Sequence, residues 1–363
     1  MSINEIILYI MVLFMVLGAI DKIIGNKFGI GEKFEEGIIT MGSLAISMVG
    51  VICLAPVLAN ILRPVIVPVF DLLGADPAMF AGSILANDMG GAPLAVELAK
   101  TPEAGLFGGL IVGAMMGPTI VFTIPVALGI INKEDQKYLA IGVLSGIITI
   151  PIGCFVGGLV AGFDIMMVLK NLIPIIIFAV VIALALFFFE NFMLKAFTVF
   201  GKIVVAIITI GLALAIIEKL TGIVIIEGLN PIEEGLTIVG DIAIVLAGAF
   251  PLVYFITKVF KKPLLKLGQL LKMNDVAAAG LIASLANSIP MFQMMKDMDN
   301  RGKIINVAFA VSAAFVFGDH LGFTAGFNKD MIFPMIVGKI VGGVTAVFVA
   351  IIISNKMLAK EKN

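Results

Sequence analysis

The stretch Ser83–Pro93, S-I-L-A-N-D-M-G-G-A-P, interrupts an apolar, helix-like run with an amide, a carboxylate, two glycines and a proline. A shorter counterpart, Ser284–Pro290, S-L-A-N-S-I-P, lies far downstream. The sequence around both stretches is apolar enough to lie in lipid. A carboxylate in a Gly/Pro break at membrane depth is energetically costly, and it points by default to a substrate or ion site. The two stretches therefore predict a transporter.

The composition favours a membrane location. Apolar residues make up 61% of the 363 residues and charged residues only 13%, whereas soluble domains are nearer half apolar and a quarter charged. The formal net charge of −1 suggests no nucleic-acid partner. One histidine, and two cysteines within apolar runs, give little basis for a metal site or a disulfide framework, so we expect no cofactor. The first apolar segment lacks the basic start of a cleaved signal and is expected to remain as a span.

Apolar runs long enough to cross the hydrocarbon layer occur at about nine places. They are, approximately, 4–20, 38–62, 104–130, 138–162, 171–189, 199–217, 237–257, 304–327 and 333–354. Two regions, 64–100 and 263–297, do not fit this description. Each contains a short amphipathic piece and then two half-length apolar pieces divided by polar or Gly/Pro residues, which is typical of a broken or re-entrant helical hairpin.

The two unusual regions correspond to each other through a long internal repeat. Phe34–Gly37 (F-E-E-G) returns as Ile232–Gly235 (I-E-E-G), 198 residues further along, and Leu85–Asn87 returns as Leu285–Asn287. The segment 171–189 has no partner. We therefore predict an N-terminal repeat at 1–165 with its hairpin at 64–100, a linker helix at 166–195, and a C-terminal repeat at 196–363 with its hairpin at 263–297.

The distribution of lysine and arginine predicts the orientation of the repeats. If each hairpin region crosses the membrane once, these residues divide evenly between the two sides. If each region enters and returns, they gather strongly on one side, as the positive-inside rule requires. We therefore predict an all-α polytopic membrane protein with two inverted repeats, about nine full spans and two re-entrant or broken hairpins. Its N-terminus lies outside and its C-terminus inside.

The hairpin tips supply the first candidate substrate-binding residues. Asp88 could hold an ammonium group or a coupling cation, or it could cap the helix that restarts at Ala92. Asn87 and Asn287 offer amide groups, although each could instead close a local turn. Ser288 offers a hydroxyl beside Asn287. We expect the two tips to meet near the bilayer midplane.

A second set of candidates lies outside the tips. Asp319 and His320 interrupt an apolar run, where they could bind a cation and orient it or relay a proton, or could simply satisfy each other. Thr119 occupies the matching place in the first repeat, but a membrane threonine often bonds its own backbone. Gln293 could line an entrance. Lys339 could extend to the interface or neutralise Asp319 when substrate is absent.

Several long motifs resemble one known family. They are F-E-E-G, L-A-P-V-L-A, M-F-A-G-S-I-L-A-N-D-M-G-G, M-M-G-P-T-I-V-F-T-I-P-V-A-L-G-I, T-I-P-I-G-C, N-S-I-P-M-F-Q-M-M-K-D-M-D-N-R-G-K-I-I-N and A-F-A-V-S-A-A-F-V-F-G-D-H-L-G-F. Over essentially the whole chain the sequence is similar to the bacterial ethanolamine permeases of the ethanolamine-utilisation operon, the EutH family. The resemblance implies a multi-pass protein of the bacterial plasma (inner) membrane that imports ethanolamine for a cytosolic lyase pathway.

The residues and the resemblance together leave three function hypotheses. The leading one is a carrier that moves ethanolamine by alternating access, with the lipid bilayer as its surroundings and, by analogy with other hairpin carriers, a homodimer as its assembly. A passive channel or facilitator for small amines is the second hypothesis, and an intramembrane enzyme using Asp88, Asp319 and His320 is the third. The sequence leaves open whether a proton or a sodium ion is coupled to transport.

Overall fold

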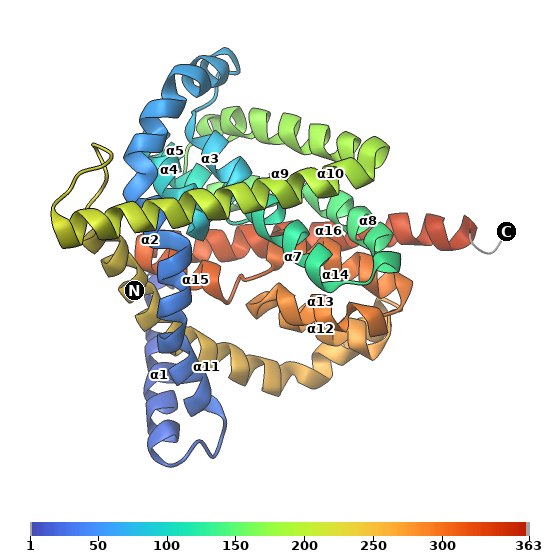
Figure 1. Cartoon of the computed structure of the whole chain (residues 1–363). Coiled ribbons are helices and arrows are strands. Elements are labelled where there is room, and N and C mark those ends of the chain that lie inside the picture. Colours follow the sequence, from blue (N-terminus) through green and yellow to red (C-terminus); the bar gives the residue numbers. More distant parts are fainter. Residues whose placement is uncertain (1, 361–363) are drawn as a thin grey trace.

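The computed structural model describes residues 2–360, and every element in that range is a helix (Figure 1). The predicted C-terminal end at 361–363 lies outside the described residues. The first elements are two long helices, α1 (Ile3–Ile23) and α2 (Ile30–Leu72), and a helical hairpin of three short pieces, α3 (Ala78–Ile84), η1 (Asn87–Met89) and α4 (Gly91–Leu98). A broken helix and a bent helix follow: α5 (Pro102–Leu106), η2 (Phe107–Val112), α6 (Met116–Pro118), η3 (Thr119–Thr123) and α7 (Ile124–Ile130), then η4 (Lys133–Asp135), α8 (Gln136–Ile147) and α9 (Ile150–Val160).

The second part of the chain contains elements of the same kinds. They are α10 (Ile165–Thr221), α11 (Ile232–Leu270), a second hairpin of α12 (Asp275–Ala286) and α13 (Ser288–Met294), then η5 (Met295–Asp297), α14 (Asn300–Ala313), α15 (Asp319–Phe327), η6 (Lys329–Met331) and α16 (Ile332–Lys360). The backbone between α14 and α15 is broken, as it is between η2 and α6. The inverted relation of the two halves stays a prediction.

The helix α10 is two limbs joined at Phe189. The backbone of this residue leaves the helical region (φ −134°, ψ 42°), and Figure 1 shows the two limbs meeting there at an acute angle. Exposed phenylalanines surround the corner: Phe187, Phe188, Phe189 and Phe192. The first limb covers most of the expected linker helix, and the chain reverses direction at its end.

Both hairpins are shorter than the sequence suggested. We expected the first to begin at residue 64, but α2 continues through Pro64 and Pro68 to Leu72, so that the hairpin starts at Ala78. The second was expected from residue 263, but α11 continues through Pro263 to Leu270. A proline removes one backbone donor without always ending a helix, and α2 and α11 both continue through theirs.

Seven helical segments are long and apolar enough to cross a membrane among the described residues, compared with the nine expected. The difference arises at two places. The segment 165–221 counts once although it bends at Phe189, and the run 304–327 is interrupted between α14 and α15. The chain is therefore an all-helical polytopic membrane protein. The number of crossings and their orientation stay predictions.

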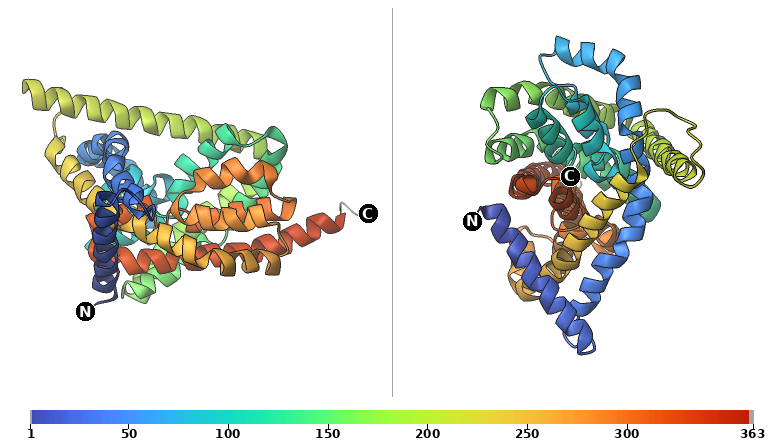
Figure 2. Two further views of the ribbon diagram at one scale, coloured as in Figure 1. Left: turned by 90° about the horizontal axis from the view of Figure 1, so that it is seen from below. Right: turned by 90° about the vertical axis from the view of Figure 1, so that its left-hand side faces the viewer.

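The helices pack together as a bundle. The helix α14 packs against α8 and α16, and α16 also packs against α9. Figure 2 shows that α16 and the second limb of α10 extend along the length of the molecule. The helix α1 stands across that direction and packs against α2 and α11. The helix breaks lie inside this bundle, where they position the candidate site.

Candidate functional site

Four interruptions of helical backbone meet in the bundle. They are the tip of the first hairpin (85–91), the break after η2 (113–115), the tip of the second hairpin at Asn287, and the break between α14 and α15 (314–318). Main-chain hydrogen bonds connect them in pairs. The amide of Asn87 donates to the carbonyl of Gly113 (2.7 Å), and the amides of Phe315 and Phe317 donate to the carbonyls of Ser284 (3.0 Å) and Leu285 (2.9 Å). Each hairpin tip therefore shares backbone groups with one broken helix.

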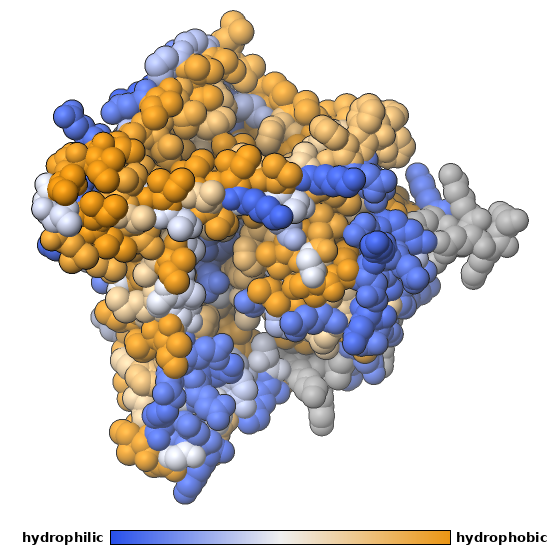
Figure 3. All heavy atoms as spheres, viewed as in Figure 1, coloured by the Kyte–Doolittle hydropathy of each residue, from blue (hydrophilic) through white to orange (hydrophobic). Residues whose placement is uncertain are grey.

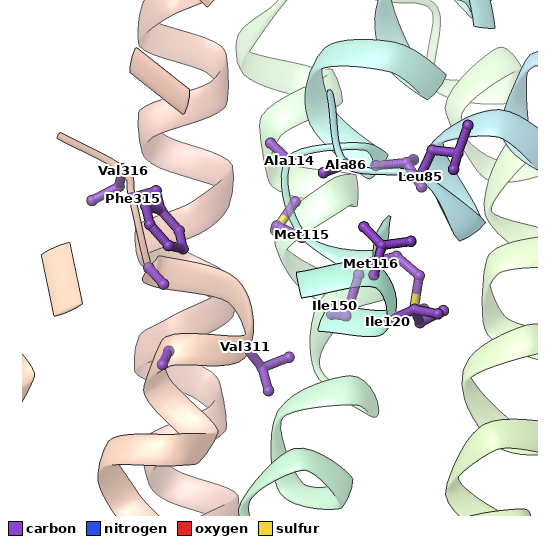
Figure 4. Close-up of a cluster of buried hydrophobic side chains, with 14 of the residues drawn as sticks. Leu85, Ala86, Ala114, Met115, Met116, Ile120, Ile150, Val311, Phe315 and Val316 are labelled. Carbon is purple, nitrogen blue, oxygen red and sulfur yellow. The ribbon is translucent and has the colours of Figure 1, made fainter. Parts of the chain in front are cut away.

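Glycines make this close approach feasible. A Cβ atom on Gly117 would collide with the carbonyl of Leu85, and one on Gly318 would collide with the carbonyl of Ala286. Figure 4 shows the resulting packing, with Leu85 and Ala86 of the first tip beside Met115 and Met116 of the first broken helix. The two hairpin tips thus pack on the breaks main chain to main chain, with no side chain between them.

A cavity of about 710 Å³ opens beside these breaks. Figure 3 shows a hollow on this face, below α10 and beside α2, with polar residues in its depth. The wall includes Asp88 from η1, Asn287 from the second tip, and Asp319 and His320 from the start of α15. Four of the predicted site residues, from both parts of the chain, are therefore brought to one cavity.

A second cavity of about 570 Å³ lies against the first. Asn287 and Asp319 line both cavities, and Lys33, Glu36 and Tyr254 line the far end of the second. Lys33 and Glu36 belong to the start of α2, next to the 24–29 loop. Asp319 is therefore reachable from two spaces.

The two aspartates are half-buried in the apolar bundle. Among residues 2–360, neither carboxylate of the pair forms a salt bridge or accepts a hydrogen bond from another residue. Buried carboxylates are normally paired, because an uncompensated charge in a low-dielectric site is costly. Two carboxylates facing one cavity suit a cationic ligand.

Lys339 lies at the centre of the breaks and does not extend to the interface. It comes from α16, has only 1% of its surface exposed, and donates from Nζ to the carbonyl of Ala114. Its Nζ also lies 3.0 Å from Nδ1 of His320. Of the two expectations for this lysine, the first is wrong. For the second, no salt bridge joins Lys339 to Asp319 among residues 2–360.

The other predicted residues differ in their surroundings. Both side-chain amide atoms of Asn87 and the hydroxyl of Ser288 are buried without a hydrogen-bond partner among the described residues, and neither side chain lines the two cavities. Thr119 donates its hydroxyl to the carbonyls of Met115 (2.8 Å) and Val311 (3.3 Å). Gln293 is exposed and lines neither cavity. The structure does not bring Thr119 or Gln293 to the candidate site.

Asn287 has one local role and one free group. Its Oδ1 accepts a hydrogen bond from the amide of Ile289 (2.8 Å), which caps α13. The turn-closing alternative is therefore correct for this oxygen. The side chain still lines both cavities, where its Nδ2 group can meet a ligand.

A polar stripe on α2 was not predicted. Thr40, Ser43 and Ser47 line the larger cavity. Their spacing of three and four residues places them on one helix face. This polar periodicity inside an apolar run is the sequence signal from which the stripe could have been predicted.

Two aromatic rings also line the cavity. The ring of Phe315 lies 5.4 Å from that of Phe122 and 5.3 Å from that of His320. Phe315 has a left-handed backbone (φ 63°), which is rare for a bulky residue and clusters at functional sites. A ring face beside two carboxylates is a further feature that suits a cation.

No group of three or more His, Cys, Asp or Glu side chains that could hold a metal ion occurs within the part of the chain that the structure describes.

Comparison with known proteins gives a consistent result. The sequence profile of the family described as "Ethanolamine utilisation protein, EutH" matches residues 3–353. The chain belongs to the EutH family. It is 70% identical to the "Probable ethanolamine permease EutH" of Listeria monocytogenes serotype 1/2a (strain 10403S), over 100% of this chain and 97% of the relative.

Other relatives are more distant but matched over a similar share of their length. The chain is 52% identical to the "Probable ethanolamine permease EutH" of Escherichia coli (strain K12), over 98% of this chain and 97% of the relative. It is also 52% identical to the "Uncharacterized protein YxeR" of Bacillus subtilis (strain 168), over 100% and 98%. No solved structure matches the chain. The predicted family resemblance is confirmed over the full length.

Proposed function

We propose that the chain is a carrier that imports ethanolamine across the bacterial plasma membrane by alternating access. The observation that carries this proposal is the pair Asp88 and Asp319, which face one cavity where four helix breaks meet. Relatives that cover the full length bear the name ethanolamine permease. Both the site and the names of the relatives support a transporter.

The chemistry of the cavity suits this substrate. Ethanolamine carries an ammonium group and a hydroxyl two carbons apart. The carboxylates of Asp88 and Asp319 would hold the ammonium, with the ring of Phe315 against it. The hydroxyls of Ser43 and Ser47 and the Nδ2 group of Asn287 are polar groups of the same cavity that would meet the substrate hydroxyl. The helix breaks that surround the cavity would prevent larger amines from binding.

The proposed transport cycle uses the hairpins as moving gates. With the predicted orientation, the 24–29 and 131–135 loops are cytoplasmic. Away from the breaks, the walls of the two cavities are then formed mainly by the cytoplasmic halves of α2, α7, α10 and α11. The structure would correspond to an inward-open state, in which the first tip closes the outer side through its bond to Gly113. Opening of that tip would expose Asp88 to the outside, as inverted repeats commonly allow.

The remaining hypotheses are weighed against the same geometry. A passive channel would need a continuous path, whereas in the predicted orientation the cavity walls beyond the breaks come from the cytoplasmic halves of the helices. An intramembrane enzyme would need substrate turnover at Asp319 and His320, and the permease names of the relatives favour transport instead. The homodimer stays part of the proposal, by analogy with other hairpin carriers.

The experiment that tests the proposed function is uptake of labelled ethanolamine into liposomes that contain the purified protein. A carrier gives saturable uptake and accelerated exchange when unlabelled ethanolamine is placed inside. Protein-free liposomes are the control. Saturation without accelerated exchange, or uptake that rises linearly with concentration, would favour a facilitator. Loss of ethanolamine to a new product would favour an enzyme.

A further inference from the structure

The buried lysine at the helix breaks is not used by the proposed recognition of substrate. Lys339 donates to the main-chain carbonyl of Ala114, which is left without its helical partner by the break at 113–115. Its second contact is Nδ1 of His320, at 3.0 Å. The side chain is 99% buried, so that water does not compensate its charge.

The contact between Lys339 and His320 can be satisfied in one way if the lysine is charged. An ammonium has three donors and no acceptor, so the ring nitrogen that faces it would have to accept. His320 would then be a neutral imidazole with its proton on Nε2, and the positive charge would belong to Lys339. The third N–H of the ammonium remains for another acceptor. The titratable groups around Lys339 are Asp88 from η1, His320 from α15 and Cys154 from α9.

Main-chain carbonyls that are freed at helix breaks are the ligands with which many carriers hold a coupling sodium ion. Here such a carbonyl, that of Ala114, is occupied by the lysine. A charge count leads to the same conclusion. With both carboxylates ionised and the lysine protonated, Asp88 and Asp319 contribute two negative charges and Lys339 one positive charge. One bound ethanolammonium makes the site neutral, and no further cation is required.

We propose that Lys339 is a tethered cation that takes the place of a coupling sodium ion, so that the protein binds and moves ethanolamine without sodium. This inference rests on the proposed function. It predicts that removal of the ammonium creates a vacancy for a small monovalent cation between the carbonyl of Ala114 and Asp88.

The test compares ethanolamine binding to the purified protein in sodium chloride and in caesium chloride. Caesium is too large for such a vacancy, and choline is avoided because it resembles the substrate. Wild-type affinity should be the same in both salts. In Lys339→Gln, affinity for the cationic substrate in caesium should rise at least about tenfold, because a positive charge beside the two carboxylates has been removed. Sodium, by filling the place of the lysine ammonium, should bring the affinity back toward the wild-type value. Sodium should also raise the melting temperature of Lys339→Gln, and not of the wild type, in the absence of substrate.

Two further variants keep the test decisive. The double variant Lys303→Gln/Asp135→Asn removes a different buried lysine together with its 2.5 Å salt-bridge partner on η4. It should show no sodium dependence. The double variant Asp88→Asn/Lys339→Gln removes opposite charges from the site, and it should bind more weakly than wild type but equally in both salts.

The inference is overturned if wild-type binding requires sodium, or if Lys339→Gln binds equally well in both salts. The wild-type comparison tests the inference even where Lys339→Gln does not fold. Absence of ethanolamine binding by the wild type in either salt would contradict the proposed function itself, which separates the two failures.

Discussion

At the scale of single residues, the site combines charges and rings that are rarely buried together. Neither Asp88 nor Asp319 forms a salt bridge or accepts a hydrogen bond from another described residue, while Lys339 contacts a carbonyl and an imidazole. This asymmetry explains why the carboxylates, and not the lysine, are available to a ligand. Phe315 completes the cavity wall with a strained backbone that only the surrounding packing can maintain.

Replacement of Phe315 by leucine should weaken ethanolamine binding about threefold to thirtyfold, because a cation over a ring contributes about 0.5–2 kcal/mol. Calorimetry or scintillation proximity with the purified protein gives the affinity. The matched control is Phe348→Leu, at an exposed position of α16. Equal affinity of Phe315→Leu and wild type would show that the ring does not contact the substrate.

Local sequence signals picked out residues that the structure places around one cavity. Asp88, Asp319 and His320 stood out because each is a polar residue inside an apolar run, and the structure brings all three to one cavity. Thr119 and Gln293 do not line the cavity, and nothing local in the sequence shows that the hydroxyl of Thr119 is bonded to Met115 or that Gln293 faces outward. The contact between Lys339 and Ala114 joins residues 225 apart in sequence, and only packing reveals it.

At the scale of elements, the two hairpins depend on close main-chain contact with the broken helices. Gly117 and Gly318 take equivalent roles, each beneath a carbonyl of one hairpin tip. The corresponding positions of the two glycines agree with the repeat in the sequence. The helices α2 and α11 continue through their prolines, so the first residues of each expected hairpin region belong to those helices.

Gly117→Ala and Gly318→Ala should each destabilise the protein by about 1–3 kcal/mol, because the added methyl must displace backbone. Thermal unfolding in detergent, followed by intrinsic or dye fluorescence, measures the effect. Gly129→Ala on α7 is the control, since a Cβ atom there has no neighbour within 4 Å. If the melting temperatures of all three variants equal that of the wild type, the tips do not pack as described.

A second element-scale prediction concerns the salt bridge between α14 and η4. Lys303 and Asp135 lie 2.5 Å apart with side chains 11% and 5% exposed. Lys303→Met alone should cost about 3–5 kcal/mol, because it leaves a buried carboxylate unpaired. Adding Asp135→Leu should recover much of that loss. The melting temperatures of the two variants test this, and a double variant no more stable than the single one would contradict the pairing.

At the scale of the whole molecule, the order of elements follows the sequence repeat, with a hairpin and a broken helix in each part. The sequence could predict this much because apolar run lengths and internal similarity are visible without contacts. It could not predict the corner at Phe189 or the angle of α1 to the bundle, which depend on packing between distant segments.

The inverted topology makes a separate prediction. Cysteines introduced singly at Lys100 and Lys296, in a variant from which Cys53 and Cys154 have been removed, should react with a membrane-impermeant maleimide from opposite sides. Lys100 should be labelled in intact cells, and Lys296 only after the membrane is opened. A cysteine in the 24–29 loop provides the cytoplasmic reference. Labelling of both positions from the same side would exclude the inverted arrangement.

The most direct test of the central claim is ethanolamine uptake into proteoliposomes by wild type, Asp88→Asn and Asp319→Asn. If the two carboxylates hold the ammonium, each variant should lose at least about thirtyfold in apparent affinity, because removing one partner of a desolvated charge pair costs about 2–5 kcal/mol. Both variants should keep the melting temperature of the wild type or exceed it. Normal uptake by both would contradict charge recognition, and it would mean that the cavity accepts the uncharged amine.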